Sequence, residues 1–248
     1  MSRPGLRAVT FDFWDTLVAA KGGSGEGIRR LQVDRCAETI AAAGLVVAGE
    51  ELEEAFDANW TRFEERWVAN NGQHTPADSV EFIAERIGVE LDAELRAQLV
   101  DGFRHVGERM ELITGAGVAE ALPELRAAGL KLGIVCDVGL TAAPVLRARL
   151  EGLGLLGMFD AWSFSDETGW FKPAAEAFEP ALVGLGVDDP ASAAHVGDNR
   201  RTDVAGALAL GMLAVRFTGF HDRSPDSGPE ADHVIDDHRK LPGLLGVA

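Results

Sequence analysis

The feature that most constrains the fold is an alternation, in the second half of the chain, of short apolar runs with helix-like segments. The runs are Leu130–Cys136, Ala161–Phe164, Ala193–Gly197, Met212–Phe217 and His233–Ile235. Such alternation is typical of a parallel sheet covered by helices. A β-branched and aromatic run near the start, Arg7–Phe13, must join the same sheet because it would otherwise lack a partner strand. We therefore predict an α/β fold.

The segment between this first strand and Gly115 has a different pattern. From Ile28 to about Ile113 the apolar residues recur with the period of a helix, and we find no strand signal. Three apolar stripes are predicted: Val33, Cys36, Ala37 and Ile40, then Leu52, Phe56, Trp60, Phe63 and Trp67, and then Leu95, Leu99, Phe103, Val106, Met110 and Ile113. Thr75 and Pro76 predict a helix N-cap followed by proline in the first turn. The sequence thus predicts an α/β domain (1–20 and 115–248) interrupted by a helical domain (21–114).

Composition excludes several classes of protein. The chain has 40 acidic and 23 basic side chains and a formal net charge of −17, which disfavours binding to nucleic acid or to an anionic membrane surface. The longest uncharged apolar run, Val204–Val215, has 12 residues, whereas a membrane-spanning helix needs about 20. Two cysteines make no disulfide framework, and acidic residues interrupt the N-terminal segment where a signal peptide is apolar. We expect a cytoplasmic protein.

Chemically active side chains follow the predicted strands where those strands end. They are Asp12, Trp14, Asp15, Thr16, Cys136, Asp137, Ser165, Asp166, Asp198 and Asp203, with Lys172 a few residues beyond the strand Ala161–Phe164. In open α/β sheets ligands bind outside the carboxyl ends of the strands. Several carboxylates and one lysine in such a crevice indicate an oxygen-ligated cation such as Mg²⁺ and an anionic substrate. A carboxylate can also act as a covalent nucleophile.

Four ordered motifs now give the chain a recognisable resemblance. They are Phe11-Asp12-Phe13-Trp14-Asp15-Thr16-Leu17, Gly133-Ile134-Val135-Cys136-Asp137, Lys172-Pro173, and Gly197-Asp198 followed by Asp203. In this order, with a helical insertion after the first, they resemble the haloacid dehalogenase superfamily, in its phosphatase-like branch. The resemblance implies a Rossmann-like parallel sheet with an inserted all-helical cap domain, and a hydrolase that acts on a small phosphorylated molecule.

The resemblance also implies roles for individual residues. Asp12 would be the nucleophile that attacks phosphorus, and Asp198 would bind Mg²⁺ beside it. The backbone carbonyl of Trp14 would be a further metal ligand, and Asp203 would support the metal through water or hydrogen bonds. Lys172 would pair with Asp12 and with the charge of the transferred group.

The second motif ends with Cys136 and Asp137, which the resemblance places in substrate binding. Cys136 stands where the family has a Ser or Thr hydroxyl that binds a phosphoryl oxygen. A thiol is a weak hydrogen-bond donor, so Cys136 would weaken phosphate binding. By themselves these residues also have ordinary structural interpretations. Cys136 would be a small buried side chain, Lys172 a solvated loop lysine, and the aspartates helix caps.

The first motif departs from the family pattern at two adjacent positions. Trp14 stands where the phosphatases carry a second Asp, which is the general acid for the leaving group, and losing a general acid lowers the rate by about 10²–10⁴. Asp15 takes the place usually held by Gly, and a bend in the loop would bring it to the position of the missing acid. The sequence thus predicts a phosphatase that is slow or specialised, with Asp15 as a further catalytic candidate.

Two other functions stay open at this stage. A non-acidic residue at the position of Trp14 also occurs in 2-haloacid dehalogenases, which use an Asp nucleophile without a metal. Those enzymes lack the Gly-Asp motif that this chain keeps as Gly197-Asp198, so phosphoryl chemistry is favoured. The second alternative is a degenerate member that binds a phosphorylated ligand without turnover. In the helical segment, Trp60 and Trp67 with Arg62 and Arg66 suggest either a bundle core or an anion pocket, and the helical spacing favours core.

Overall fold

The computed structural model describes residues 5–21, 24–70, 74–222 and 227–246. They form two compact units. The first, here called the α/β unit, lies within Met1–Ala19, Leu112–Asp137 and Leu150–Ala248. The second, the helical unit, lies within Ala20–Glu111 and Val138–Arg149.

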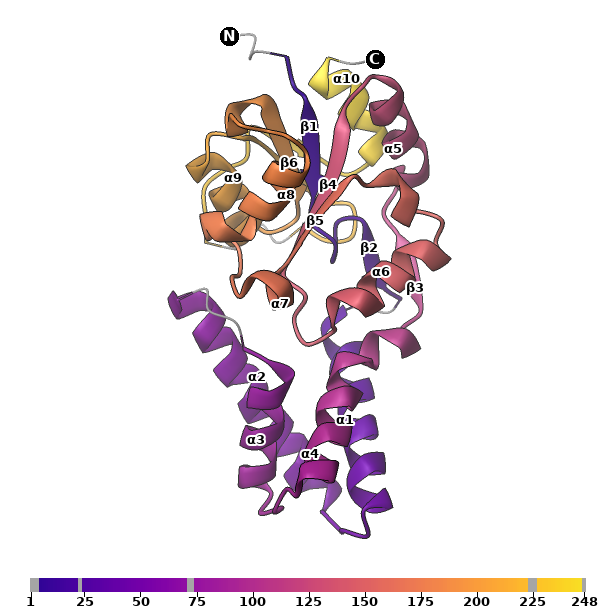
Figure 1. Ribbon diagram of the computed structural model, residues 1–248, viewed down its shortest axis with the longest axis vertical. Helices are drawn as coiled ribbons and strands as arrows, with labels where there is room; N and C mark the ends of the chain where they lie inside the picture. The colour runs from indigo at the N-terminus through magenta and orange to yellow at the C-terminus, as the bar shows by residue number, and fades with distance from the viewer. Residues whose placement is uncertain (1–4, 22–23, 71–73, 223–226, 247–248) are drawn as a thin grey trace. The chain divides into compact units, whose positions relative to one another are not determined.

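The α/β unit is built on a parallel sheet with strand order β5-β4-β1-β6-β7-β8 (Figure 1). The strands are β1 (Ala8–Phe11), β4 (Lys131–Cys136), β5 (Ala161–Phe164), β6 (Ala193–Gly197), β7 (Leu213–Phe217) and β8 (His233–Ile235). All six predicted apolar runs are therefore strands of one sheet, and the predicted fold class is confirmed. β1 lies between β4 and β6, so the residues after β1 stand at the middle of the carboxyl edge.

Helices cover both faces of this sheet (Figure 1). α5 (Val118–Ala127) packs against β4 and α10 (Leu241–Leu245) on one side. α8 (Glu179–Gly184) packs against β4 and β5, and α9 (Ala205–Ala209) against β7, on the other. The short helix α7 (Ser165–Thr168) follows β5 directly. One apolar core cluster includes Phe178, Leu182, Leu185, Val204 and Met212. β1, β6 and β7 are buried along their whole length, which explains their continuous apolar runs, whereas the edge strand β8 has His233 and Val234 exposed.

A two-stranded sheet of β2 (Val18–Ala20) and β3 (Leu112–Thr114) was not predicted. It shows that the predicted helical face is wrong in its last part, because Leu95, Leu99 and Phe103 lie buried on α4 (Ala93–Arg104) whereas Ile113 lies in a strand. α4 ends at Arg104, a 3₁₀ turn covers Val106–Arg109, and the chain is extended from Leu112. Met110 is buried, whereas Ile113 is 44% exposed. A three-residue strand is too short to show a period of its own, so the preceding helical spacing masked it.

The helical unit consists mainly of α1 (Ser24–Ala42), α2 (Gly49–Asn70), α3 (Pro76–Arg86) and α4 (Ala93–Arg104), while α6 (Ala143–Gly152) begins in it. Thr75 caps α3 with its side chain in a capping box completed by Asp78, which confirms the predicted helix start. In its core the rings of Phe56 and Phe103 stack at 5.6 Å. Across the described ranges, every helix is too short or too polar to traverse a bilayer.

One residue of the aromatic stripe departs from the core interpretation. The ring of Trp60 stacks on Phe63 with centroids 5.3 Å apart, yet Trp60 is 48% exposed. Phe63 is buried, as expected for a core residue. The indole therefore packs one face onto its neighbour and leaves the other in solvent, as large amphipathic rings do at the edge of a bundle.

Candidate active site

Asp12 lies immediately after β1, and the structure holds its backbone and its side chain at the centre of the sheet edge. Its N–H donates to the carbonyl of Val196 on β6 at 2.8 Å. Thr16 Oγ1 donates to Asp12 Oδ2 at 3.3 Å, and Asp12 is 5% exposed. Burial raises the pKa of the Asp12 carboxyl, and the ammonium of Lys172 opposes that rise.

Lys172 is the buried cation of the site and does not behave as a solvated loop lysine. It is 2% exposed, and its Nζ lies 2.5 Å from Asp12 Oδ1 and 2.6 Å from Asp203 Oδ1. Nζ also donates to the carbonyl of Val135 at 3.1 Å. Burial lowers the pKa of this ammonium, but the surrounding carboxylates outweigh it and hold the pKa well above its usual value. Lys172 is therefore charged and fixed between the two aspartates.

Asp203, in the π-helical turn Arg200–Val204, anchors Lys172 from the side opposite Asp12. Its Oδ2 accepts from the backbone N–H of Asn199 at 3.0 Å. Burial raises the pKa of this carboxyl, but Lys172 and a histidine contact hold it well below its usual range. Gly197 makes the packing possible, because a Cβ there would lie 2.3 Å from Asp203 Cγ.

His195 and Thr10 were not identified from the sequence, yet they support Asp203 from behind. His195 Nε2 is 3.1 Å from Asp203 Oδ1, and its Nδ1 is 2.8 Å from Thr10 Oγ1. Because an ionised carboxylate only accepts, Nε2 is the ring nitrogen that donates to Asp203, and burial lowers the pKa of the imidazole. Thr10 and His195 occupy paired positions on β1 and β6. In the sequence, both are polar residues inside apolar strands. Because buried polar groups need hydrogen-bond partners, this pattern could have indicated that they contact another polar residue.

The second motif brings Cys136 and Asp137 to the same edge of the sheet. Cys136 ends β4 and is buried, and burial followed by the nearby Asp12 raises the pKa of its thiol well above the usual value. It is therefore a neutral, weakly polar side chain. Asp137 Oδ1 accepts the backbone N–H of Lys172 at 3.0 Å. Asp137 thus helps to position the lysine, a contact that its predicted substrate-binding role did not include.

Trp14 and Asp15 form the turn after β1. The backbone of Trp14 makes an isolated bridge to Val18, and its ring meets Phe13 edge to face at 4.8 Å. Asp15 has φ of +56°, in the left-handed region where glycine is favoured. This explains physically why glycine suits that position. Asp tolerates the conformation better than most residues do.

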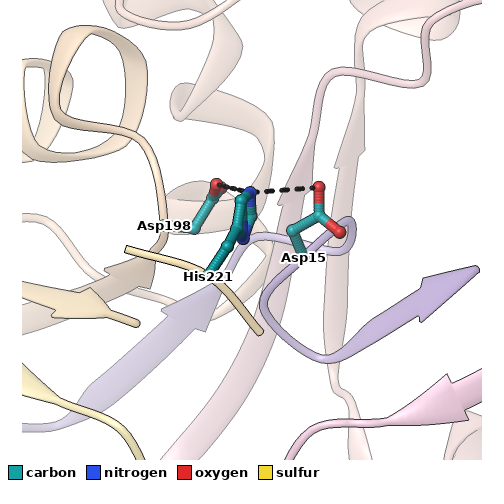
Figure 2. A group of neighbouring side chains, drawn as sticks. All are labelled: Asp15, Asp198 and His221. Atoms are coloured by element: carbon teal, nitrogen blue, oxygen red, sulfur yellow. Dashed lines mark ion pairs between the residues drawn. The ribbon is translucent and has the colours of Figure 1, made fainter. Parts of the chain in front are cut away.

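Among the residues that the structure describes, two overlapping groups of side chains have the spacing of a cation site. One ligand atom from each of Asp12, Asp198 and Asp203 lies within 4.8 Å of the other two, and all three residues are buried. The other group is Asp15, Asp198 and His221 (Figure 2). His221, which follows β7, was also not identified from the sequence.

The all-oxygen group fits Mg²⁺ by the chemistry of its donors. Mg²⁺ is a hard cation that is held by one or two carboxylates together with water and phosphate oxygens. Asp12, Asp198 and Asp203 supply only carboxylate oxygens, and they stand on neighbouring elements at the centre of the sheet edge.

Comparison with known proteins shows the family to which the chain belongs. A family model of haloacid dehalogenase-like hydrolases matches residues 6–211. The human haloacid dehalogenase-like hydrolase domain-containing protein 3 is 30% identical over 243 residues, which cover 93% of this chain and 90% of the relative. Ribulose-1,5-bisphosphate 5-phosphatase of Halopiger xanaduensis is 36% identical over 147 residues, 56% of this chain and 58% of that protein.

The chain is also similar to a dehalogenase and to a phosphatase of known structure. The (S)-2-haloacid dehalogenase of Pseudomonas sp. strain YL is 26% identical over 184 residues, 74% of this chain and 71% of the relative. The crystal structure of a phosphatase of the same superfamily from Thermococcus onnurineus superposes with a TM-score of 0.65 at 26% identity, covering 97% of this chain and 98% of that one. The family model and the human relative show that the chain belongs to the haloacid dehalogenase-like hydrolases.

Proposed function

We propose that this hydrolase cleaves phosphomonoesters of small molecules through a covalent aspartyl-phosphate on Asp12. The observation that carries the proposal is the buried Lys172, which bridges Asp12 and Asp203 at 2.5 and 2.6 Å. A buried ammonium between carboxylates fixes the nucleophile and supplies positive charge where a phosphoryl group would enter. Relatives with phosphatase names, among them the ribulose-1,5-bisphosphate 5-phosphatase, support this choice.

The first chemical step follows from how Asp12 is held. Lys172 holds Oδ1 at 2.5 Å, whereas Oδ2 accepts only the longer 3.3 Å bond from Thr16, so we assign the attack on phosphorus to Oδ2. The new O–P bond forms as the bond from phosphorus to the ester oxygen breaks, and the electron pair leaves with that oxygen. In the second step water attacks phosphorus, inorganic phosphate departs, and Asp12 is regenerated as a carboxylate. Lys172 stays charged throughout and stabilises the negative charge on the transferred group.

The residues that would hold Mg²⁺ are Asp12 and Asp198, with the backbone carbonyl of Trp14 as a further ligand and Asp203 as support. When bound, the cation would polarise the phosphoryl oxygens and neutralise charge that builds up on them. Cys136 and Asp137 would line the same phosphate position. The helical domain, residues 21–114, would act as a cap that selects the substrate.

Removal of divalent cations tests the metal assignment. We expect EDTA to abolish phosphate-ester hydrolysis and added Mg²⁺ to restore it, because Asp12 and Asp198 would otherwise repel the anionic substrate. The measurement is the initial rate on a panel of phosphate esters before chelation, after chelation and after Mg²⁺ is added back. A rate that does not respond to EDTA would show that the metal assignment is wrong and would favour the dehalogenase alternative.

The leaving-group dependence tests the consequence of Trp14. Without a carboxylic acid at this position, more negative charge must develop on the departing oxygen. We therefore expect aryl phosphates to be hydrolysed much faster than alkyl or sugar phosphates, with kcat/KM falling steeply as the leaving group becomes more basic. Trp14→Asp should raise the rate on alkyl esters by up to about 10² and change the aryl esters little.

Asp15 provides the control for this experiment, because it is the other residue able to serve as the acid. A flat leaving-group dependence in the wild type that becomes steep only in Asp15→Asn would contradict the role given to Trp14. It would make Asp15 the general acid instead. Unchanged alkyl-ester rates in Trp14→Asp, in a folded variant, would count against Trp14 as well.

Dehalogenation of 2-haloacids is the second candidate function. It is favoured by the apolar side chain of Trp14 and by the similarity to the Pseudomonas (S)-2-haloacid dehalogenase. The buried Asp198 beside Asp12 argues against it, because a metal-free reaction has no use for that carboxylate. Including 2-haloacids in the substrate panel separates the two functions. Binding of a phosphate mimic without turnover on any ester would instead indicate the degenerate, ligand-binding alternative.

A further inference from the structure

We propose that Asp15, Asp198 and His221 form a second divalent-cation site, adjacent to the first and suited to Zn²⁺. Figure 2 shows the imidazole of His221 between the two carboxylates. Its Nε2 is 3.7 Å from Asp15 Oδ2 and 3.7 Å from Asp198 Oδ2. The three ligand atoms all lie within 4.8 Å of one another. One imidazole with two carboxylates is a donor set that differs in chemistry from the all-oxygen group beside it.

The two distances match ligands around a cation better than hydrogen bonds. A charge-assisted hydrogen bond from an imidazole to a carboxylate measures about 2.7–2.9 Å. Two ligands that each lie about 2.0–2.2 Å from a tetrahedral Zn²⁺ are separated by about 3.4 Å. His221 stands at 3.7 Å from both carboxylates, so a shift of a few tenths of an ångström completes the geometry.

The sheet explains why these three residues meet. Asp15 belongs to the turn after β1, Asp198 follows β6, and His221 follows β7, and these three strands are neighbours. Asp15 and Asp198 are 8% and 7% exposed, whereas the side chain of His221 is 33% exposed. The carboxylates are thus largely desolvated and the imidazole is reached from solvent, which gives a cation a path of entry.

The charge of the edge favours a second cation. Asp12, Asp15, Asp198 and Asp203 are buried carboxylates at this edge of the sheet, and the ammonium of Lys172 is buried between Asp12 and Asp203. A divalent cation held by Asp12, Asp198 and Asp203 leaves Asp15, Asp198 and His221 as a separate set of donors. A carboxylate has two oxygens, so Asp198 can bind one cation with each and bridge them, as in sites where two metals stand about 3.5–4 Å apart.

The class of cation follows from the imidazole. Imidazole nitrogen binds Zn²⁺ well, whereas Mg²⁺ prefers oxygen donors.

The test is calorimetric titration of Zn²⁺ into the full chain in excess Mg²⁺. We expect the wild type to bind one Zn²⁺, and His221→Asn and Asp15→Gly each to weaken that binding at least about 100-fold. His233→Asn is the matched control, because His233 is an exposed histidine on β8, and it should bind as the wild type does. Glycine adopts the left-handed conformation of Asp15 freely, and the thermal midpoint of unfolding of Asp15→Gly is measured beside the titration to separate loss of binding from unfolding.

Zinc-edge X-ray absorption supplies an independent readout of the ligands. The wild type should show one imidazole nitrogen in the zinc shell, and His221→Asn should lack it. Zn²⁺ that binds His221→Asn with wild-type affinity would overturn the proposal, because it would occupy the Asp12 group or the surface. Failure of the wild type to bind Zn²⁺ would overturn it too. Neither result tests the proposed function. That proposal is contradicted instead if the rate of phosphate-ester hydrolysis does not change when EDTA is added.

Discussion

Asp12→Asn is expected to yield a folded protein whose turnover is at least about 10⁴-fold slower than that of the wild type. An amide oxygen is a poor nucleophile, and loss of a covalent nucleophile removes the whole two-step route. Stability should change little or rise, because Asp12 is one of several crowded carboxylates and burial already opposes its ionised form. The measurements are kcat on the best phosphate ester and the thermal midpoint of unfolding.

The control for Asp12→Asn is Asp188→Asn, which makes the same chemical change at an exposed aspartate in the loop before β6. It should keep wild-type activity and stability. If Asp12→Asn retains more than about a tenth of the wild-type rate, Asp12 is not the nucleophile.

Lys172→Met is the second substitution with a large expected effect, and it acts on both stability and activity. Removing the ammonium leaves Asp12 and Asp203 as buried carboxylates that repel each other. Breaking a buried ion pair by deleting one partner destabilises a protein by about 3–5 kcal/mol. We expect a loss of that size in the free energy of unfolding, measured in urea, and no detectable turnover.

A second variant separates the electrostatic cause from a packing defect. Adding Asp203→Asn to Lys172→Met removes one of the two unpaired charges, so it should recover part of the lost stability while turnover stays absent. Lys240→Met, at a lysine whose side chain is 56% exposed, should change stability by less than about 0.5 kcal/mol. A Lys172→Met variant as stable as Lys240→Met would contradict the buried bridge.

The residues that could be predicted from the sequence are those whose position follows from the topology. Parallel strands present their carboxyl ends at one edge, so Asp12, Asp198, Asp203 and Lys172 meet although they are far apart in the chain. The strands were identified because strands buried on both faces are continuously apolar. Since the six-stranded sheet forms the centre of the α/β unit, this was enough to predict its fold class.

The residues that could not be predicted depend on contacts that no local pattern encodes. His221 lies in a loop after β7 and reaches Asp15 and Asp198 only through the fold. His195 contacts Asp203 from an otherwise apolar strand. In the sequence alone, a single histidine in such a strand does not indicate which residue it contacts. The exposure of Trp60 shows the same limit, because helical spacing indicates a face but not how far that face extends into solvent.

Acid quenching during the first turnover tests the central claim most directly. A phosphate ester labelled in its phosphoryl group is mixed with excess protein, the reaction is stopped in acid within one turnover, and the peptides are analysed by mass spectrometry. The account predicts a transient phosphoryl group on the peptide that contains Asp12, at up to one group per chain, and none in Asp12→Asn. Steady turnover with no phosphoryl group on the protein, or with the group on a residue other than Asp12, would contradict it.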